Sequence, residues 1–66
     1  MPSDIKELRS KNAGELSRDL SEKREALRRF RFELASGRIK NIRMIRETRR
    51  SIAKILTVLA EKEKSL

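Results

Sequence analysis

The side chains most able to do chemistry in this sequence are the arginines and lysines between residues 38 and 54. This stretch holds seven basic residues, and Glu47 is its only acid. A planar guanidinium can hold a phosphate through two parallel hydrogen bonds, which lysine cannot do in the same fixed geometry. Because a solvated helix face normally mixes both charge signs, this one-sided stretch predicts a polyanionic ligand.

The spacing of these cations gathers them on one side of a helix. At about 100° per residue, that side carries three basic residues, which are Arg43, Arg50 and Lys54. Two further polar side chains, Arg46 and Thr57, lie next to them. The opposite side carries the apolar residues Ile45, Ile52 and Leu59. We therefore expect the basic face to point away from the hydrophobic contact of the helix.

The charge of the whole chain supports the same chemistry. Eighteen Lys and Arg residues against ten Asp and Glu give a formal charge of +8 over 66 residues. Residues 1–36 hold nine basic and seven acidic side chains, whereas residues 37–66 hold nine basic and three acidic ones. The second half is therefore the expected anion-binding half, with nucleic acid the leading ligand.

The residue inventory excludes most catalytic and metal chemistry. Cys, His, Trp and Tyr are absent, which removes disulfides, zinc sites and Cys- or His-based nucleophiles. Neighbouring carboxylates such as Glu22 with Glu25 have no base and no pocket beside them. We expect no enzyme activity, no cofactor and no metal, and the lack of a secretion or membrane-crossing segment favours a cytoplasmic location.

The elements that must position these residues are helices. One Pro, two Gly and two Phe in the chain favour helix over sheet. We predict a short helical turn at about residues 3–9, with Ser3 and Asp4 as caps, and long helices at about 13–36 and 40–62. Asn12 and Glu15 have the spacing of a capping box. Ser36-Gly37 should end the first long helix, because Gly37 can adopt the left-handed conformation.

Apolar residues recur at intervals of three and four along both long helices, which is the pattern of a coiled-coil seam. Lys23 stands at the one interrupted step. The expected fold is all-α, an antiparallel two-helix hairpin forming one domain over residues 1–66, with the opening turn as a frayed appendage and a fraying tail from Glu61. Such a small core is marginal, so we expect a partner surface to complete it. The seam residues are Leu16, Leu20, Leu27, Phe30, Leu34, Ile45, Thr48, Ile52, Ile55 and Leu59.

The first long helix has a different charge pattern. Its acidic and basic residues alternate from Arg18 to Glu25, so pairing within the helix explains most of that charge. Phe32 falls on the far side of the helix from the seam and should face outward. It could stack on a base or enter a partner's pocket, or it could cover the turn near Ile39.

Three segments of the chain carry a resemblance, and they are Lys6-Glu-Leu-Arg9, Leu27 to Gly37, and Ile45-Arg-Glu-Thr-Arg-Arg-Ser-Ile-Ala-Lys-Ile-Leu-Thr-Val-Leu59. They resemble the opening turn, the central segment and the signature of the family of large-subunit ribosomal protein twenty-nine. The third segment is the most specific match. Arg28, Glu33 and Ile42 depart from the family pattern.

The resemblance implies a structural, non-catalytic protein that binds large-subunit ribosomal RNA near the nascent-chain exit tunnel. It also implies ribosomal protein twenty-three as a neighbour, nascent-chain factors that dock nearby, and a monomer within the ribosome. Matching by position adds Arg31, Phe32 and Asn41 to the basic stretch. The full candidate RNA-binding set is Arg31, Phe32, Arg38, Lys40, Asn41, Arg43, Arg46, Arg49, Arg50, Lys54 and Thr57.

Two alternatives remain open from the residues themselves. The same seam could join two chains in a homodimeric coiled coil. The isoleucines opposite the arginines could instead make the second helix an amphipathic membrane-surface segment, although it carries no interfacial Trp.

Overall fold

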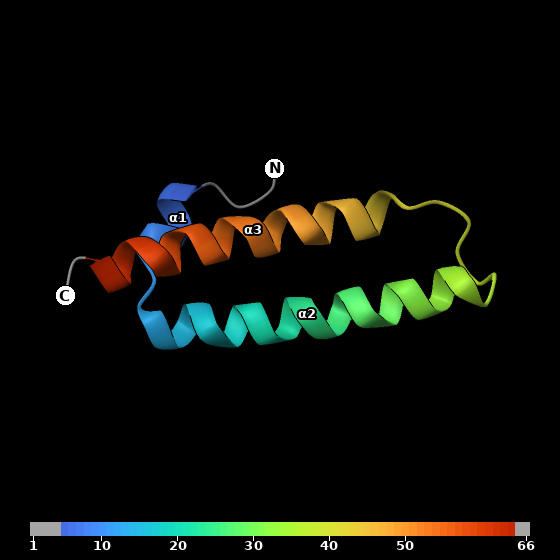
Figure 1. Ribbon diagram of the computed structural model, residues 1–66, viewed down its shortest axis with the longest axis horizontal. Helices are drawn as coiled ribbons and strands as arrows, with labels where there is room; N and C mark the ends of the chain where they lie inside the picture. Colours follow the sequence, from blue (N-terminus) through green and yellow to red (C-terminus); the bar gives the residue numbers. More distant parts are fainter. Residues whose placement is uncertain (1–4, 65–66) are drawn as a thin grey trace.

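The computed structural model describes residues 5–64, and helix is the only regular secondary structure over that range. The helices are α1 (Ile5–Arg9), α2 (Ala13–Ala35) and α3 (Arg43–Lys64). The long helices α2 and α3 lie side by side and antiparallel, and α1 packs against α3 at the end away from their linker (Figure 1). This arrangement confirms the predicted all-helical hairpin, which measures 45 × 21 × 15 Å. The predicted caps Ser3 and Asp4 lie outside the described residues.

Side-chain and backbone caps fix both ends of α2. The Oδ1 atom of Asn12 accepts a hydrogen bond from the Glu15 amide at 2.8 Å, and the Glu15 carboxylate accepts one from the Asn12 amide at 3.4 Å. This confirms the predicted capping box. At the other end Gly37 has a φ of 83°, in the left-handed region, and its amide donates to the Leu34 carbonyl at 3.1 Å. The Arg38 amide donates to the Glu33 carbonyl at 2.9 Å, completing a Schellman motif.

The linker to the second long helix is longer than the sequence pattern suggested. Helix α3 begins at Arg43 rather than near residue 40, and it extends to Lys64. The Asn41 side chain accepts from the Arg43 amide at 3.2 Å, and the first helical bond runs from the Arg46 amide to the Ile42 carbonyl at 2.9 Å. An Asn side chain that bonds its own backbone two residues on favours a turn, which holds this segment out of the helix.

The hydrophobic core lies at the α1 end of the molecule. Leu8 of α1, Leu16 of α2, and Ile55 and Val58 of α3 are all buried, and Leu8 is only 3% exposed. The predicted frayed appendage is therefore wrong: α1 packs Leu8 against α3 and contributes a core residue. Leu8 and Val58 were both missing from the predicted seam, because α1 widens the buried side of α3 beyond the stripe that faces α2.

The ten predicted seam residues all lie on the inward sides of α2 and α3. Leu16, Ile45 and Ile55 are buried. The remaining seven are half-buried, and they are Leu20, Leu27, Phe30, Leu34, Thr48, Ile52 and Leu59. Leu20 and Leu59 pack directly against the buried cluster. The contact between the helices is thus dry near α1 and more open toward the linker.

Ion pairs fasten the α1 end. Arg9 donates to both carboxylate oxygens of Glu61, at 3.0 and 2.9 Å, and Lys62 Nζ donates to the Arg9 carbonyl at 3.2 Å. The tail predicted to fray from Glu61 is therefore helical to Lys64, because these contacts tie its last turns to α1. Lys11 reaches Asp19 at 2.7 Å, which joins the loop after α1 to α2.

Both of these ion pairs shift a pKa. The hydrogen bonds from Arg9 lower the pKa of Glu61 below the usual range of a glutamate. The hydrogen bond to Asp19, together with its negative charge, raises the pKa of Lys11. Because the pKa of Glu61 is lower in the folded protein, its ionised carboxylate stabilises the fold. This stabilisation is fully present above the ordinary glutamate pKa. That contribution is lost as the pH falls through the folded-state value.

Replacing Leu8 with Ala should destabilise the fold although α1 has only five residues. Removing a buried leucine side chain costs about 2–5 kcal/mol in free energy of unfolding. Urea unfolding followed by circular dichroism measures this loss. Leu56→Ala removes the same atoms from a side chain that is 42% exposed, and it should cost much less. Equal losses in the two variants would show that α1 does not dock as described.

Acidification should weaken the contact between α1 and the end of α3 before it affects the rest of the molecule. Protonating Glu61 removes the charge that Arg9 binds, so the protection of amides in residues 5–9 and 58–64, measured against the intrinsic exchange rate at each pH, should fall as the pH drops below the ordinary glutamate range. Hydrogen exchange followed by mass spectrometry compares the wild type with Glu61→Gln. In Glu61→Gln these amides should already be less protected at neutral pH, and their protection should change less with pH. If their protection changes with pH as in the wild type, a carboxylate other than Glu61 causes the effect.

Candidate nucleic-acid interface

An open groove of about 690 Å³ runs between α2 and α3 near the linker. Its floor is apolar, with Leu34 from α2 and Ile45 and Ala53 from α3. Ile42, at the end of the linker, is half exposed at its edge. The remaining lining residues are the four arginines Arg31, Arg46, Arg49 and Arg50. The lining therefore combines apolar surface with positive charge and contains no carboxylate.

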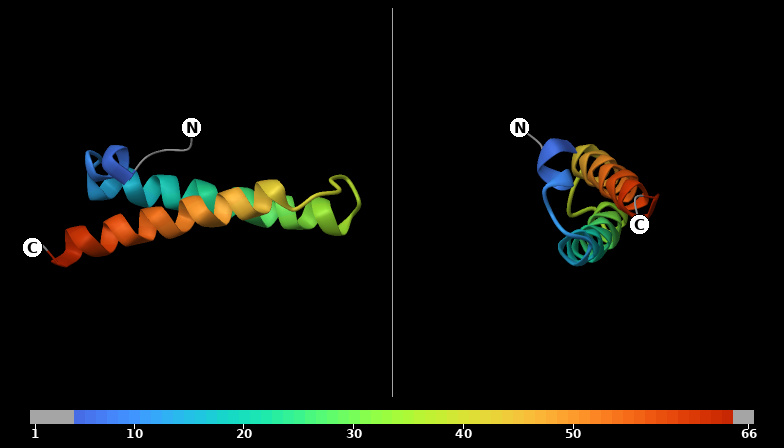
Figure 2. Two further views of the ribbon diagram at one scale, coloured as in Figure 1. Left: turned by 90° about the horizontal axis from the view of Figure 1, so that it is seen from above. Right: turned by 90° about the vertical axis from the view of Figure 1, so that its left-hand side faces the viewer.

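The groove lies on the side of α3 that α1 does not cover. Arg49 and Val58 are nine residues apart, which at about 100° per residue places them on opposite sides of α3. Val58 is buried in the core cluster with Leu8 of α1. Viewed along the hairpin, α1 lies against one side of the pair formed by α2 and α3 (Figure 2). The other side is left open, and the half-buried part of the seam is accessible there.

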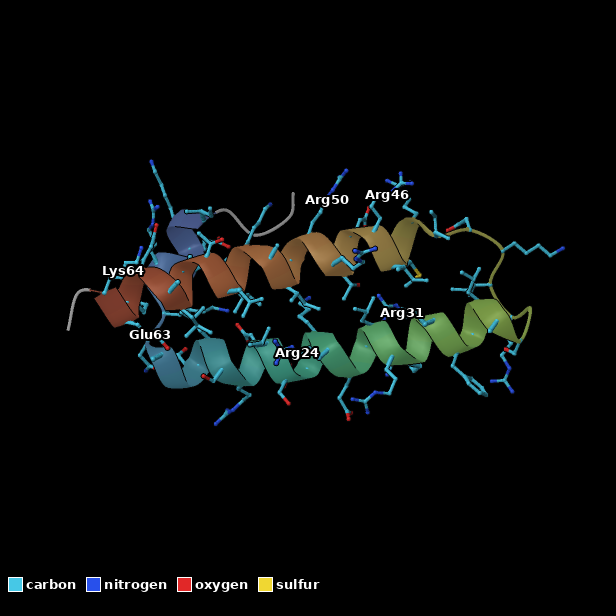
Figure 3. All side chains as sticks on the ribbon, viewed as in Figure 1. Arg24, Arg31, Arg46, Arg50, Glu63 and Lys64 are labelled. Atoms are coloured by element: carbon cyan, nitrogen blue, oxygen red, sulfur yellow. The ribbon has the colours of Figure 1, made fainter. Side chains whose placement is uncertain are left out.

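None of the four groove arginines has an ion-pair partner within the part of the chain that the structure describes. Arg31 extends from α2 toward α3, whereas Arg46 and Arg50 project from the side of α3 turned away from α2 (Figure 3). The guanidinium groups therefore stand at the mouth and along the outer edge of the groove. All four side chains are exposed, so they can bind an anion without first breaking an internal contact.

The basic face drawn from helical periodicity overlaps the groove at Arg50 and at the adjacent Arg46. The sequence grouped Arg43, Arg50 and Lys54 opposite the seam, whereas the structure groups Arg50 with Arg46 and Arg49 beside it. Arg43 is exposed but pairs with Glu47 at 3.1 Å, and Lys54 is half-buried. The hydroxyl of Thr57 is exposed and donates to the Ala53 carbonyl of its own helix at 2.9 Å.

The linker places three more candidates at the same end of the hairpin. Arg38, Lys40 and Asn41 are all exposed, and the two cations have no carboxylate partner among residues 5–64. The Asn41 oxygen is used to accept from the Arg43 amide, which leaves its side-chain amide group free to donate. These residues extend the positive surface around the turn.

Phe32 lies apart from the groove. It is 68% exposed, which confirms that it faces outward and disfavours the reading in which it merely covers Ile39. Phe32 directly follows Arg31, so its side chain is turned by about 100° around α2 from the side chain of Arg31 at the groove mouth. An aromatic ring this exposed is available for stacking or for insertion into a partner.

The alternating charges of α2 pair less completely than the sequence suggested. Within α2 the structure shows one ion pair among its described residues, Arg28 with Glu25 at 3.9 Å, while Asp19 binds Lys11 outside the helix. Arg24 is exposed with no ion-pair partner in residues 5–64, and it stands seven residues before Arg31. Two turns of helix put both on one side of α2, so Arg24 extends the basic line (Figure 3). The spacing of seven residues between Arg24 and Arg31 is the signal in the sequence that places Arg24 on this surface.

Comparisons with known proteins identify the family of the chain. The sequence profile of the ribosomal L29 protein family matches residues 6–62. The chain belongs to the ribosomal L29 protein family. Membership makes it a structural ribosomal protein rather than an enzyme, and it bears out the resemblance seen in the motifs.

The curated relatives of this ribosomal L29 protein carry the name Large ribosomal subunit protein uL29. The relative from Thermotoga petrophila is 46% identical over 57 residues, covering 86% of each chain. The relative from Corynebacterium diphtheriae is 45% identical over 60 residues, which cover 91% of this chain and 79% of that protein. No solved structure shows a significant match to the chain.

The structure also bears on the first of the two alternatives, the homodimer. The seam that a homodimeric coiled coil would need is occupied within one chain, where α2 packs on α3. Among residues 5–64 no helix is both long and apolar enough to span a bilayer.

Removing the one acid of the basic stretch should strengthen binding to a polyanion. Glu47→Gln frees Arg43 from its ion pair, so the variant should elute from heparin at a higher salt concentration than the wild type. Glu25→Gln changes the net charge equally but lies near the middle of α2, and it should shift elution less. Identical shifts would mean that heparin responds to net charge and does not distinguish the α3 surface.

Proposed function

We propose that this protein is a structural component of the large ribosomal subunit that binds large-subunit ribosomal RNA through the groove and the linker. The observation that carries the proposal is the set of four arginines that two helices bring to one open groove lined by no carboxylate. Among residues 5–64 none of these four has an ion-pair partner, whereas Arg43 of α3 is paired with Glu47.

The mechanism is charge neutralisation at fixed positions. Each guanidinium that binds a phosphate releases condensed counterions, and this release drives association at moderate salt. Because Arg31 stands on α2 and Arg49 on α3, their separation depends on the hairpin remaining closed. A rigid pair of helices can thereby hold two RNA strands that would otherwise repel each other, and phosphate contacts would supply affinity while shape supplies specificity.

The linker residues and Phe32 complete the proposed RNA contact. Arg38 and Lys40 add charge where the chain turns, and Asn41 can donate from its side-chain amide. Phe32, exposed beside Arg31, can stack on an unpaired base. Arg43 and Lys54 contribute less to the proposed RNA contact, because Arg43 is paired with Glu47 and Lys54 is half-buried.

The position within the subunit is also part of the proposal. The resemblance of Ile45–Leu59 to the family signature supports a site near the mouth of the nascent-chain exit tunnel. It likewise supports ribosomal protein twenty-three as a neighbour and a docking area for nascent-chain factors beside both. Because the seam is closed within one chain, the protein would act there as a monomer.

Removing two groove charges should weaken RNA binding and reduce its dependence on salt. The double variant Arg46→Gln/Arg50→Gln should lose about tenfold in affinity for large-subunit ribosomal RNA. Its plot of log affinity against log salt should become shallower by about two, since each phosphate contact contributes about 0.9 to the slope. Filter binding at several salt concentrations measures both quantities.

A matched control removes two arginines from the other side of α2. At about 100° per residue, Arg18 and Arg29 both lie on the side of α2 away from Arg31. Arg18→Gln/Arg29→Gln changes the net charge by the same amount, but neither residue lines the groove. This control should keep the wild-type slope and should remain on large subunits pelleted through a high-salt cushion. If both double variants lose the same slope, the RNA does not bind at the groove.

A further inference from the structure

The floor of the groove raises a question that phosphate binding leaves unanswered. Ala53 and Ile42 present apolar surface to solvent beside the four arginines, Leu34 is half-buried, and Ile45 is buried beneath them. An RNA double helix offers phosphates, sugars and polar base edges but no free base face, so docking it across the arginines would leave the floor without an apolar partner. Burying apolar surface away from water is favourable, which favours an occupant that enters the groove.

The size and rim of the groove suit a flat and negatively charged occupant. Its volume of about 690 Å³ lies within the roughly 300–1,000 Å³ typical of pockets that take small molecules. Arg31 stands at the mouth, and Arg46 and Arg50 project along the outer edge (Figure 3). A planar ring could enter between the helices, where guanidinium planes can stack on it, while the phosphates on either side of it meet the outer arginines.

We propose that the groove takes the base of one unpaired nucleotide of the ribosomal RNA, with the flanking phosphates held by Arg46 and Arg50. This inference rests on the proposed function, because it concerns the same surface, and it specifies a single-stranded nucleotide where the proposed function requires only RNA phosphates. The apolar floor excludes water from the base, and the arginines at the rim supply stacking and charge.

The lining argues against the other occupant that such a groove could take, an apolar peptide segment. Four arginines without carboxylate partners in residues 5–64 would repel a basic segment, and a neutral apolar segment would cover the guanidinium groups without supplying a counter-charge. The guanidinium is, moreover, the side chain best suited to face both a base and a phosphate. The observations therefore favour the nucleotide.

Filling the groove tests the proposal. Ala53→Leu adds bulk to the floor at an exposed position of α3, and leucine is a strong helix former, so the fold should survive. Ala60→Leu is the matched control, because Ala60 is also exposed, stands two turns further along α3 and does not line the groove. Circular dichroism of both variants checks that their helix content is unchanged.

The readout is dimethyl sulfate probing of large subunits that contain the wild type, either variant or no copy of the chain. We expect an unpaired adenine or cytosine that the wild type and Ala60→Leu protect equally. In Ala53→Leu particles its reactivity should rise to that of particles lacking the chain, while the variant remains bound.

Two results would overturn the proposal. If Ala53→Leu stays bound and no unpaired base changes reactivity, the base does not enter the groove, although the RNA-binding function stands. If Ala53→Leu loses its place in the particle and neither the wild type nor Ala60→Leu protects any unpaired base relative to particles lacking the chain, the occupant of the groove is not a base and a protein segment takes its place. Failure of the wild-type chain to join large subunits at all would defeat the proposed function itself, which is a separate outcome.

Discussion

The packing of Leu8 and Leu16 against Ile55 and Val58 is the contact on which the rest of this molecule depends. A chain of 66 residues can bury few side chains, and here the fully dry contacts lie at one end of the hairpin. Because α1 folds back onto α3, four leucine, isoleucine and valine side chains from three helices close around one another. This cluster sets the angle and register of α2 and α3, and those in turn fix where the arginines lie.

The distribution of charge follows the same division. At the core end, Glu61 and Asp19 are paired with Arg9 and Lys11, so acids there hold separate segments together. At the linker end, Arg31 on α2 and the groove arginines Arg46, Arg49 and Arg50 of α3 have no such partners among residues 5–64. One end of the hairpin thus holds the core and the ion pairs between helices, and the other carries the surface that we propose binds RNA. Because the core and the basic surface lie at different ends of the hairpin, the contact between α2 and α3 can stay less tightly packed at the linker end without loss of the core.

Much of the architecture could be read from local patterns because local physics decides it. The capping box of Asn12 and Glu15 and the left-handed Gly37 involve residues within a few positions of one another, and both formed as expected. The details that failed depend on distant partners. Leu8 and Val58 are buried by each other's helices, and the last turns of α3 are held by Arg9 of α1, fifty-two residues away from Glu61. No periodicity within one helix contains that information.

The sequence alone therefore determined that the chain is helical, that it turns at Gly37, that its second half is basic and that its ligand is an anion, since each follows from residue type and short-range spacing. The tertiary structure decided which cations act together. Periodicity on one helix groups Arg43, Arg50 and Lys54, but a groove between two helices is lined by residues on the facing flanks of both, so Arg31 joins Arg46, Arg49 and Arg50 while Arg43 binds Glu47. Such a groove forms only when two helices pack together, so the periodicity of a single helix could not reveal which residues line it.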